Sequence, residues 1–258
     1  MPPINDSDRD WERFGSTDPY FAVLTAPEFH GKISGAERAR FFQSGVDHID
    51  TMFAIIREHL DPSFAPERAL DFGCGVGRLL IPLAARCSDV TGMDISPSML
   101  AEARHNCDAA GATAVRLVQS DDTLSALNGE FDFIHTYIVL QHIPVARGET
   151  IIRGLARRLA PNGIAMIQVP YTGGREGLLS KALYWTRMAV PGGRQAVNLL
   201  RGKPPGAPVM QMNPYSVTRL LDIVAAEGCH DVHIRFSEHN GARGVLLFAR
   251  KHPAPIFS

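Results

Sequence analysis

Residues 69–80 have the sequence Ala-Leu-Asp-Phe-Gly-Cys-Gly-Val-Gly-Arg-Leu-Leu, a short apolar run followed by three glycines at alternate positions. The run predicts a buried β-strand over 68–72, and glycines after a strand allow a tight turn in which backbone amides approach a ligand. The residues that follow predict a helix over 78–86, whose N-terminus would favour an anion. The stretch is therefore typical of a nucleotide-type cofactor site.

A second acid follows this loop at the end of the next predicted strand. Asp94 lies 21 residues after Gly73, where a carboxylate can accept hydrogen bonds from both hydroxyls of a ribose. Asp71 stands before the glycines, whose spacing is Gly-x-Gly-x-Gly, whereas dinucleotide sites have Gly-x-Gly-x-x-Gly. An acid at this place disfavours a pyrophosphate and favours a ligand that carries an ammonium group. A nicotinamide oxidoreductase is therefore the disfavoured alternative.

Strand patterns and helix patterns alternate around the loop. The predicted strands are 68–72, 89–94, 114–119, 131–137, 164–169, 232–236 and 244–250. The first five alternate with helices and predict parallel β-α-β units, whereas the last two can pair antiparallel through a turn near Asn240-Gly241. We expect an α/β fold with a doubly wound, mostly parallel seven-stranded sheet whose last strand is antiparallel.

Capping residues mark three helix starts. Ser34 forms a capping box with Glu37 and predicts a helix over 36–60. Ser96, followed by proline, predicts a second start, and Asn213, also followed by proline, predicts the third.

The chain divides into two predicted units. Residues 1–62 are expected to form a helical N-terminal cap that covers the substrate, and residues 63–258 a Rossmann-like domain. An insertion after the fifth strand, at about 171–212, is rich in glycine, proline and basic residues and predicts a lid over the site. Its amphipathic piece 177–190 suits an acidic or lipid-like acceptor or a peripheral contact with a membrane surface; an ordinary lid helix is the alternative.

Composition excludes several classes. The formal net charge of -1 disfavours a nucleic-acid binder that uses its whole surface. The four cysteines are scattered without metal-type or disulfide-type spacing, so we expect no metal site. The N-terminal stretch lacks the apolar core of a signal peptide, and no apolar run is long enough to span a membrane. A cytoplasmic protein is expected.

The motifs together resemble a known family. Besides 69–80, they are VTGMDISPSML (90–100), LVQSDD (117–122), FDFIHTYIVLQHIP (131–144) and LAPNGIAMIQVP (159–170). The chain resembles the class I S-adenosylmethionine-dependent methyltransferases over about residues 65–170 by motif and over the last helix and strands by order. The resemblance implies S-adenosylmethionine as cofactor and S-adenosylhomocysteine as product.

The resemblance also implies the reaction. We expect methyl transfer to a small-molecule acceptor, with oxygen favoured over nitrogen or carbon. Two alternatives remain: a non-catalytic cofactor-binding protein that engages a protein partner, and a methyltransferase that acts on a lipid, glycan or protein.

The family's cofactor contacts map onto the loop and the strand ends. The expected contacts are Asp71, Gly73, Cys74, Gly75, Gly77, Arg78, Asp94, Ile95, Met99, Asp121, Asp122 and Tyr137. The resemblance assigns the adenine amine to Asp121 first and to Asp122 second, because the register is ambiguous by one residue. Structural alternatives remain for Arg78 as a cap, Met99 as a core residue and Cys74 as a small spacer.

The acceptor side is less defined. His142 is a candidate general base, with a structural or cofactor-lining role as the alternative, and His135 is a weaker candidate inside the fourth strand. Tyr171, Tyr215 and His239 are candidates for the acceptor pocket. The Asn/Asp-Pro-Pro-Tyr/Phe turn of nucleic-acid amino-methyltransferases is absent after the fourth strand, so we expect no nucleic-acid partner.

Overall fold

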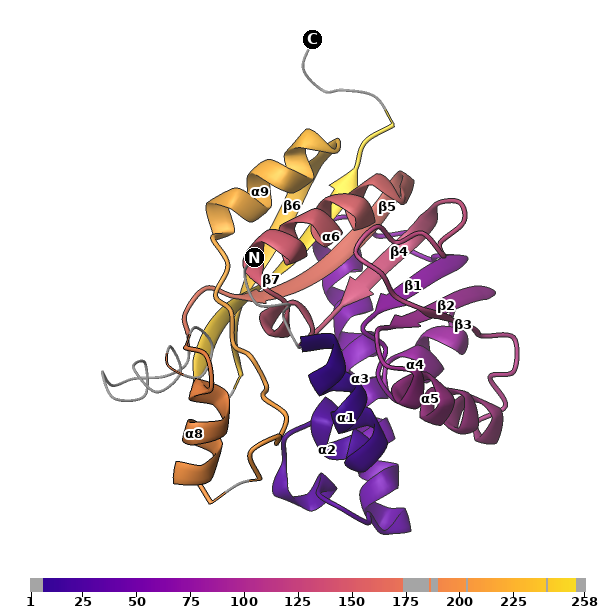
Figure 1. The fold of residues 1–258 in the computed structure, drawn as a ribbon. Helices are drawn as coiled ribbons and strands as arrows, with labels where there is room; N and C mark the ends of the chain where they lie inside the picture. The colour runs from indigo at the N-terminus through magenta and orange to yellow at the C-terminus, as the bar shows by residue number, and fades with distance from the viewer. Residues whose placement is uncertain (1–6, 174–185, 187–189, 203, 240, 254–258) are drawn as a thin grey trace.

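The computed structural model describes residues 7–173, 186, 190–202, 204–239 and 241–253. At its centre is a seven-stranded sheet in the order β3-β2-β1-β4-β5-β7-β6 (Figure 1). The strands are β1 (Arg68–Phe72), β2 (Asp89–Asp94), β3 (Arg116–Gln119), β4 (Phe131–Thr136), β5 (Leu159–Pro170), β6 (Cys229–His239) and β7 (Ala242–Lys251). The first five are parallel, and β7 runs antiparallel to both β5 and β6. The predicted fold class is confirmed.

Helices cover both faces of the sheet (Figure 1). On one face lie α3 (Gly35–His59), α4 (Leu80–Ala84) and α5 (Pro97–Ala109), where Ile49 and Phe53 of α3 share a core with Phe133 of β4. On the other face lie α6 (Val145–Arg157) and α9 (Val217–Ala226), where Leu155 and Leu220 share a core with Ile134 of β4. Each face of the parallel sheet is thereby buried, which explains the nearly continuous apolar runs in its strands.

Two of the three predicted helix starts are confirmed. Ser34 accepts a hydrogen bond from the Glu37 amide at 3.3 Å, and the Glu37 carboxylate accepts one from the Ser34 amide at 2.6 Å. The Ser96 hydroxyl accepts from the Met99 amide at 3.1 Å at the start of α5. Side-chain caps therefore fix both starts.

The third predicted start is wrong. The helix α9 begins at Val217 with Ser216 as its N-cap, not at Asn213. The Asn213 amide donates to a backbone carbonyl at 2.8 Å, and the Tyr215 amide donates to the carbonyl of Pro170 at 2.7 Å. The first bond ties the chain to Gln141 and the second ties it to the end of β5, and residues 213–216 are therefore not helical.

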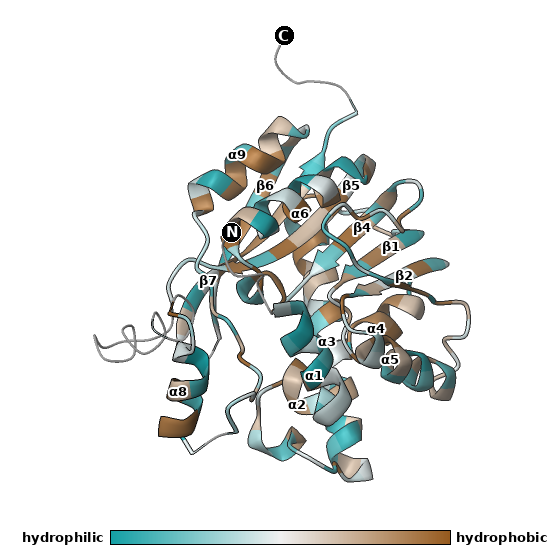
Figure 2. Ribbon diagram, viewed as in Figure 1, coloured by the Kyte–Doolittle hydropathy of each residue, from teal (hydrophilic) through white to brown (hydrophobic). Residues whose placement is uncertain are grey.

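The N-terminal helices lie at the end of the sheet where β1 and β2 finish (Figure 1). They are α1 (Ser7–Thr17), α2 (Pro19–Val23) and the 3₁₀ turn η1 (Pro27–Phe29). Figure 2 shows α1 as largely hydrophilic, and it buries only Ser7, Asp10 and Gly15. The segment 1–62 thus combines a polar helix at the edge with α3, which packs on the sheet. Its boundary as a separate unit stays a prediction.

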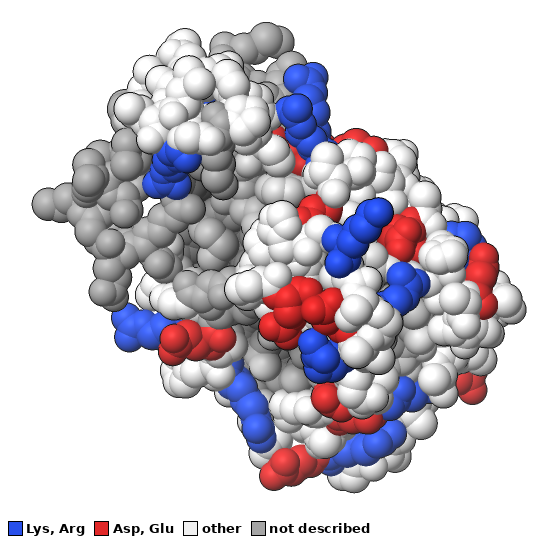
Figure 3. All heavy atoms as spheres, turned by 90° about the horizontal axis from the view of Figure 1, so that it is seen from below, with Lys and Arg blue, Asp and Glu red and all other residues white. Residues whose placement is uncertain are grey.

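The insertion over 171–212 is described only in part. Its described portion includes the helix α8 (Gly193–Leu200), while most of the predicted amphipathic piece 177–190 lies outside the described residues. Acidic and basic side chains are interspersed over the described part of the surface in Figure 3. No helix among the described residues is long and apolar enough to cross a membrane. All four cysteines are buried and free.

Candidate cofactor and active site

A cavity of about 900 Å³, measured out to its open mouth, lies at the carboxyl ends of β1, β2 and β4. Because β1 sits between β2 and β4, this is the point where the strand order reverses and where open α/β sheets bind their ligands. Of the predicted cofactor residues, all except Gly77 and Asp121 line the cavity. The structure therefore brings most of them together at one place.

The first two glycines of the loop, Gly73 and Gly75, leave no room for side chains. Gly73 has φ +78°, and a Cβ there would lie 2.2 Å from a methyl group of Val139. Gly75 has φ +50°, and a Cβ there would lie 2.7 Å from a methyl group of Val23. Gly77 faces α5 and has φ +88°, so its contribution is the turn itself. The backbone of the loop can thus stand directly against a ligand.

The helix after the loop is shorter than predicted. It begins at Leu80 and has 5 residues, whereas the sequence predicted 78–86. Residues 76–79 form turns that complete the bend of the glycine loop. Arg78 lies in this turn and lines the cavity, so a cationic side chain stands next to the start of α4, where the sequence predicted an anion site.

Asp94 ends β2 at the floor of the cavity. Its carboxylate accepts a hydrogen bond from the Gly75 amide at 2.9 Å and another from the Ser96 amide at 2.9 Å. Burial is the largest influence on Asp94 and raises its pKa to about 6, although both amides act in the opposite direction. A buried carboxylate fixed in this way is suited to accept hydrogen bonds from a ribose.

Two opposite charges line the methionine end of the expected site. Asp71 is 2% exposed and Arg78 is 5% exposed. Asp71 Oδ2 and Arg78 Nε are buried and have no hydrogen-bond partner among the described residues. Burial lowers the pKa of Arg78, and nearby Tyr137 and Asp71 partly offset this. One acceptor and one donor, each without a partner in the same cavity, match a zwitterionic α-amino acid.

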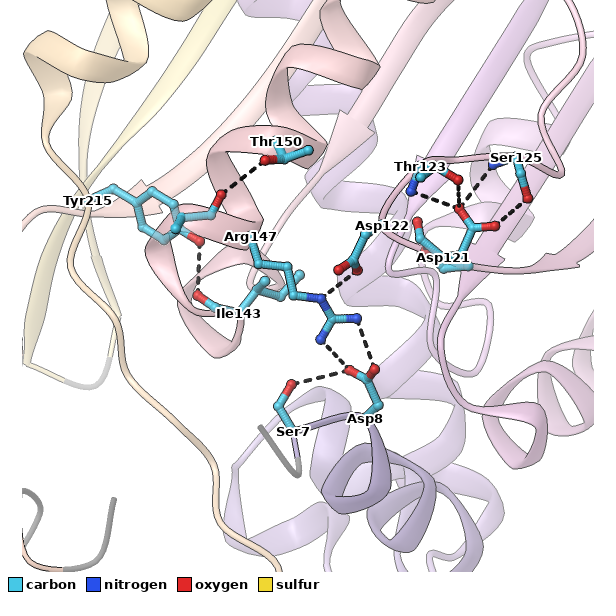
Figure 4. A network of polar contacts seen from close by, with 12 residues as sticks. Ser7, Asp8, Asp121, Asp122, Thr123, Ser125, Ile143, Arg147, Thr150 and Tyr215 are labelled. Atoms are coloured by element: carbon cyan, nitrogen blue, oxygen red, sulfur yellow. Dashed lines mark hydrogen bonds and ion pairs between the residues drawn. The ribbon is translucent and has the colours of Figure 1, made fainter. Parts of the chain in front are cut away.

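The two candidates for the adenine contact differ in their surroundings (Figure 4). Asp121 caps a turn: its carboxylate accepts from the amides and hydroxyls of Thr123 and Ser125, which hold its pKa below the ordinary range. Asp122 lines the cavity and accepts a hydrogen bond from Arg147. The geometry favours Asp122, the second choice of the sequence.

The helix α1, which belongs to the predicted N-terminal cap, forms a wall of the cavity. Ser7, Asp8 and Trp11 line it. Asp8 accepts two hydrogen bonds from Arg147 of α6, at 2.6 and 2.9 Å. Glu12 accepts from the Ser96 hydroxyl at 2.6 Å, at the start of α5. Polar contacts to two helices of the core therefore hold α1 over the site.

His142 lies at the cavity beside Trp11, in the 3₁₀ turn η2 (Leu140–His142). The two ring centroids are 4.8 Å apart. Nδ1 lies 2.7 Å from the Gln211 carbonyl oxygen, and the Gln141 amide nitrogen lies 3.1 Å from Nε2. Because a carbonyl only accepts, Nδ1 carries the proton, and the lone pair of the neutral ring is on Nε2.

His135 is a core residue of β4 with no exposed surface, and it does not line the cavity. Its Nδ1 lies 2.9 Å from Asp71 Oδ1 and its Nε2 lies 3.0 Å from His48 Nε2. It therefore contacts a cavity residue without facing the ligand space. Tyr137, two residues further, does line the cavity.

Of the predicted acceptor residues, neither Tyr171 nor Tyr215 lines the cavity. Tyr215 is buried and its hydroxyl donates toward the carbonyls of Leu140 and Ile143, at 3.0 and 2.9 Å. Tyr171 packs edge-on against Phe236, outside the cavity lining. The side chain of His239 lies outside the described residues. The N-terminal helices and the turn after β4 contribute to the cavity lining instead.

That turn contains a strained residue. Ile138 lines the cavity with φ 61°, a value that β-branched side chains rarely adopt. Its amide donates to the Gln168 side-chain oxygen of β5 at 3.0 Å. The buried amide of Gln168 therefore helps to fix the backbone that borders the site.

Comparison with known proteins finds methyltransferases. Residues 69–163 match the family described as a methyltransferase domain. A trans-aconitate 2-methyltransferase of Methylobacterium nodulans is 37% identical over 113 residues, which are 42% of this chain and 40% of that protein. A ubiquinone biosynthesis O-methyltransferase of Dechloromonas aromatica is 32% identical over 102 residues, 39% of this chain and 43% of that protein. The matched part thus spans less than half the length of these relatives.

The fold extends the likeness to the whole chain. The crystal structure of magnesium protoporphyrin IX methyltransferase from Synechocystis PCC 6803 with bound S-adenosylmethionine superposes with a TM-score of 0.62. The two chains are 18% identical in sequence, and the match covers 97% of this chain and 100% of the Synechocystis chain. At this identity the likeness concerns the architecture.

Proposed function

We propose that the chain is a class I S-adenosylmethionine-dependent methyltransferase and that it methylates an oxygen atom of a small-molecule acceptor. The observation that carries the cofactor part of this proposal is the pair of buried atoms Asp71 Oδ2 and Arg78 Nε, which have no hydrogen-bond partner among the described residues and belong to side chains that line one cavity. The relatives named above support a small acceptor, since their names refer to trans-aconitate and to ubiquinone biosynthesis.

Each part of the cofactor has a counterpart in the cavity. Asp71 would accept from the α-ammonium group and Arg78 would donate to the α-carboxylate. Asp94 would accept from the ribose hydroxyls, and Asp122 from the exocyclic amine of adenine. The close approach of Gly73 and Gly75 leaves the loop backbone free to contact the ligand between these points.

When bound, S-adenosylmethionine supplies a methyl group on a sulfonium that is open to in-line displacement. The protein has to align the acceptor and to exclude water. Ser7, Asp8 and Trp11 of α1 cover part of the cavity. A cover of this kind keeps the reacting atoms in a site with few water molecules, where charges act strongly.

His142 is the residue best placed to take a proton from an acceptor hydroxyl. Its protonated Nδ1 is held by the Gln211 carbonyl, which leaves Nε2 as the basic atom. The side-chain oxygen of Gln141 is buried without a hydrogen-bond partner among the described residues. After Nε2 takes up a proton, rotation of the Gln141 amide would offer this oxygen as an acceptor. The amide can therefore stabilise both protonation states of the ring.

Calorimetry with S-adenosylmethionine, S-adenosylhomocysteine and NAD tests the cofactor assignment. We expect both sulfur compounds to bind and NAD to bind at least a hundredfold more weakly. Arg78→Met should lower the affinity for S-adenosylhomocysteine by about tenfold, in line with a charged hydrogen bond of about 1.5–3 kcal/mol. The control is Arg86→Met, because Arg86 pairs with Asp50 away from the cavity. Tight binding of NAD alone would overturn the assignment.

The acceptor is tested by incubation with cofactor labelled in its methyl group. Extracts of the source cells, fractionated into small molecules, lipids and proteins, should receive label in the small-molecule fraction as an ether or ester. Label in protein or lipid would contradict the proposed acceptor class. Binding of cofactor with no label in any fraction would favour a non-catalytic binding protein. His142→Gln should reduce turnover at least a hundredfold while cofactor affinity changes less than threefold.

A further inference from the structure

The helix α3 approaches the glycine loop unusually closely. A Cβ at Gly45 would lie 2.1 Å from the carbonyl oxygen of Arg78. The neighbouring Ser44 and His48 are four residues apart and therefore lie on the same face of the helix. Gly45 thus allows these two side chains to reach the residues beneath the cavity.

Ser44 contacts the cationic side of the site. Its hydroxyl donates to the Phe41 carbonyl at 2.7 Å and accepts a hydrogen bond from Arg78 Nη1 at 3.3 Å. No carboxylate forms an ion pair with Arg78 among the described residues. Ser44 therefore holds one end of the guanidinium, while Nε remains unpartnered on the other edge.

His48 contacts the anionic side through a second histidine. Asp71 and His135 are register partners on β1 and β4, so their side chains lie on the same face of the sheet as α3. His135 donates from Nδ1 to Asp71 Oδ1 at 2.9 Å, because a carboxylate only accepts. One N–H then lies between the Nε2 atoms of His135 and His48, 3.0 Å apart.

The same histidine ring braces the cavity wall. The centroid of His48 lies 4.2 Å from that of Tyr137, which lines the cavity. Burial, more than any neighbouring charge, lowers the pKa of His48 to about 2, so the ring is neutral at working pH. A neutral ring can occupy this place beside Arg78 without opposing its charge.

We propose that α3 positions the two charged side chains, Asp71 and Arg78, that would bind the methionine end of the cofactor. Ser44 acts on Arg78 directly, and His48 acts on Asp71 through His135. The inference rests on the proposed cofactor site and adds three positioning residues to it. Holding Asp71 Oδ1 and Arg78 Nη1 in place restricts the rotation of both side chains and so limits where Oδ2 and Nε can lie. Both side chains are thereby oriented before the ligand arrives, which reduces the entropy lost on binding.

Three ligands distinguish the effect of Ser44 on Arg78 from the effect of His48 on Asp71. S-Adenosylhomocysteine carries both charges of the amino acid, decarboxylated S-adenosylmethionine lacks the carboxylate, and 5′-methylthioadenosine lacks the whole amino acid. Affinities are measured by calorimetry, or by displacement of S-adenosylhomocysteine where direct binding is weak. Each variant is first shown to retain the melting temperature of the parent protein within a few degrees.

His48→Phe keeps the ring against Tyr137 and removes the hydrogen bond to His135. We expect about tenfold weaker binding of S-adenosylhomocysteine and of decarboxylated S-adenosylmethionine, with methylthioadenosine changed less than twofold. His48→Gln, which retains an N–H donor, should recover at least half of the lost affinity on a logarithmic scale.

Ser44→Ala should weaken S-adenosylhomocysteine about threefold and leave the other two ligands unchanged. Thr51→Ala is the matched control, because Thr51 also donates to a backbone carbonyl of α3, at 2.7 Å, but on the exposed face. Equal losses for all three ligands would show that α3 only supports the fold, and no loss for any of them would also overturn the inference. If the parent protein bound none of the ligands, the proposed function itself would fail.

Discussion

Arg147 of α6 donates two hydrogen bonds to the carboxylate of Asp8 in α1 and a third to Asp122 at the cavity (Figure 4). Asp8 and Arg147 are 139 residues apart in the sequence. The ion pair thus joins two helices that are far apart in the sequence. This one guanidinium therefore fastens the N-terminal helix to the residue expected to contact adenine.

Loss of this fastening should speed cofactor release. Arg147→Met is expected to raise the dissociation rate of S-adenosylhomocysteine about fivefold, because the partly exposed ion pairs contribute on the order of 1 kcal/mol. In the parent protein the rate should rise with salt, and in the variant this dependence should be weaker. Stopped-flow fluorescence of Trp11 and the other tryptophan follows the release. Arg153→Met, on the same helix but paired with Glu227, is the control and should leave the rate unchanged.

Cofactor affinity should depend on pH through Asp94. Its pKa is raised to about 6, and the protonated form cannot accept from both ribose hydroxyls. Affinity is therefore full above pH 7 and should fall about tenfold for each pH unit below 6. Calorimetry between pH 5 and 8 measures this. Asp94→Asn should bind weakly at every pH, and a slope that survives in this variant would assign the titration to another group.

The raised pKa of Asp94 affects stability in the opposite direction: the unfolding free energy of the ligand-free protein falls as pH rises, whereas cofactor affinity increases. The folded pKa of Asp94 lies above the unfolded value near 3.8, so the ligand-free protein binds a proton more tightly than the unfolded chain. Its contribution to the free energy of unfolding is favourable at low pH and is lost as pH rises through 6. Asp94→Asn should therefore raise the melting temperature of the ligand-free protein at pH 7, measured by calorimetry, while it weakens cofactor binding.

Gly73→Ala and Gly111→Ala form a matched pair. Both positions have positive φ, 78° and 75°, so alanine is strained at each. A Cβ at Gly111 meets nothing within 4 Å, whereas at Gly73 it meets Val139. Gly111→Ala should lose about 1 kcal/mol of unfolding free energy in denaturant titrations and Gly73→Ala more, because its Cβ also meets Val139, but only Gly73→Ala should lose cofactor binding by more than tenfold. Equal affinities would remove Gly73 from the site.

Tyr215 should act in stability and not in acceptor binding. Tyr215→Phe removes the hydroxyl that reaches two buried carbonyls and is expected to cost about 1–2 kcal/mol, or about 3–6 °C in Tm. Tyr171→Phe keeps its ring against Phe236 and should change Tm by less than 1 °C. The KM for the acceptor, once it is known, should be the same in both variants. A raised KM for Tyr215→Phe alone would restore it to the acceptor pocket.

The fold and the cofactor loop could be predicted because their signals are local. The strands β1 and β2 begin and end at the predicted residues, since apolar runs are bounded there by glycines and by a capping serine. The choice between Asp121 and Asp122 was ambiguous, because a shift of one residue in a strand or its exit turns the side chain to the other side. Only the structure showed that the carboxylate of Asp121 is hydrogen-bonded within the turn and that Asp122 lines the cavity.

Contacts between distant segments could not be predicted. The sequence predicted that the N-terminal segment covers the substrate, but it gave no sign that Asp8 would pair with Arg147 of α6 or that Trp11 would lie beside His142. His48 occupies a position in an amphipathic helix where any residue facing the sheet fits the pattern. Gly45 was the available signal: a glycine inside a helix costs about 1 kcal/mol relative to alanine and often marks a close approach.

The polar character of α1 makes cofactor affinity a property of two equilibria. Polar contacts to Ser96 and Arg147 hold α1 over the site, so the strength of these contacts sets how far α1 favours the closed position. The affinity measured in solution equals the affinity of the closed form multiplied by the fraction of molecules that are closed. Substitutions on α1 far from any ligand atom can therefore tune how tightly the protein holds S-adenosylhomocysteine, while the loop and the sheet remain unchanged.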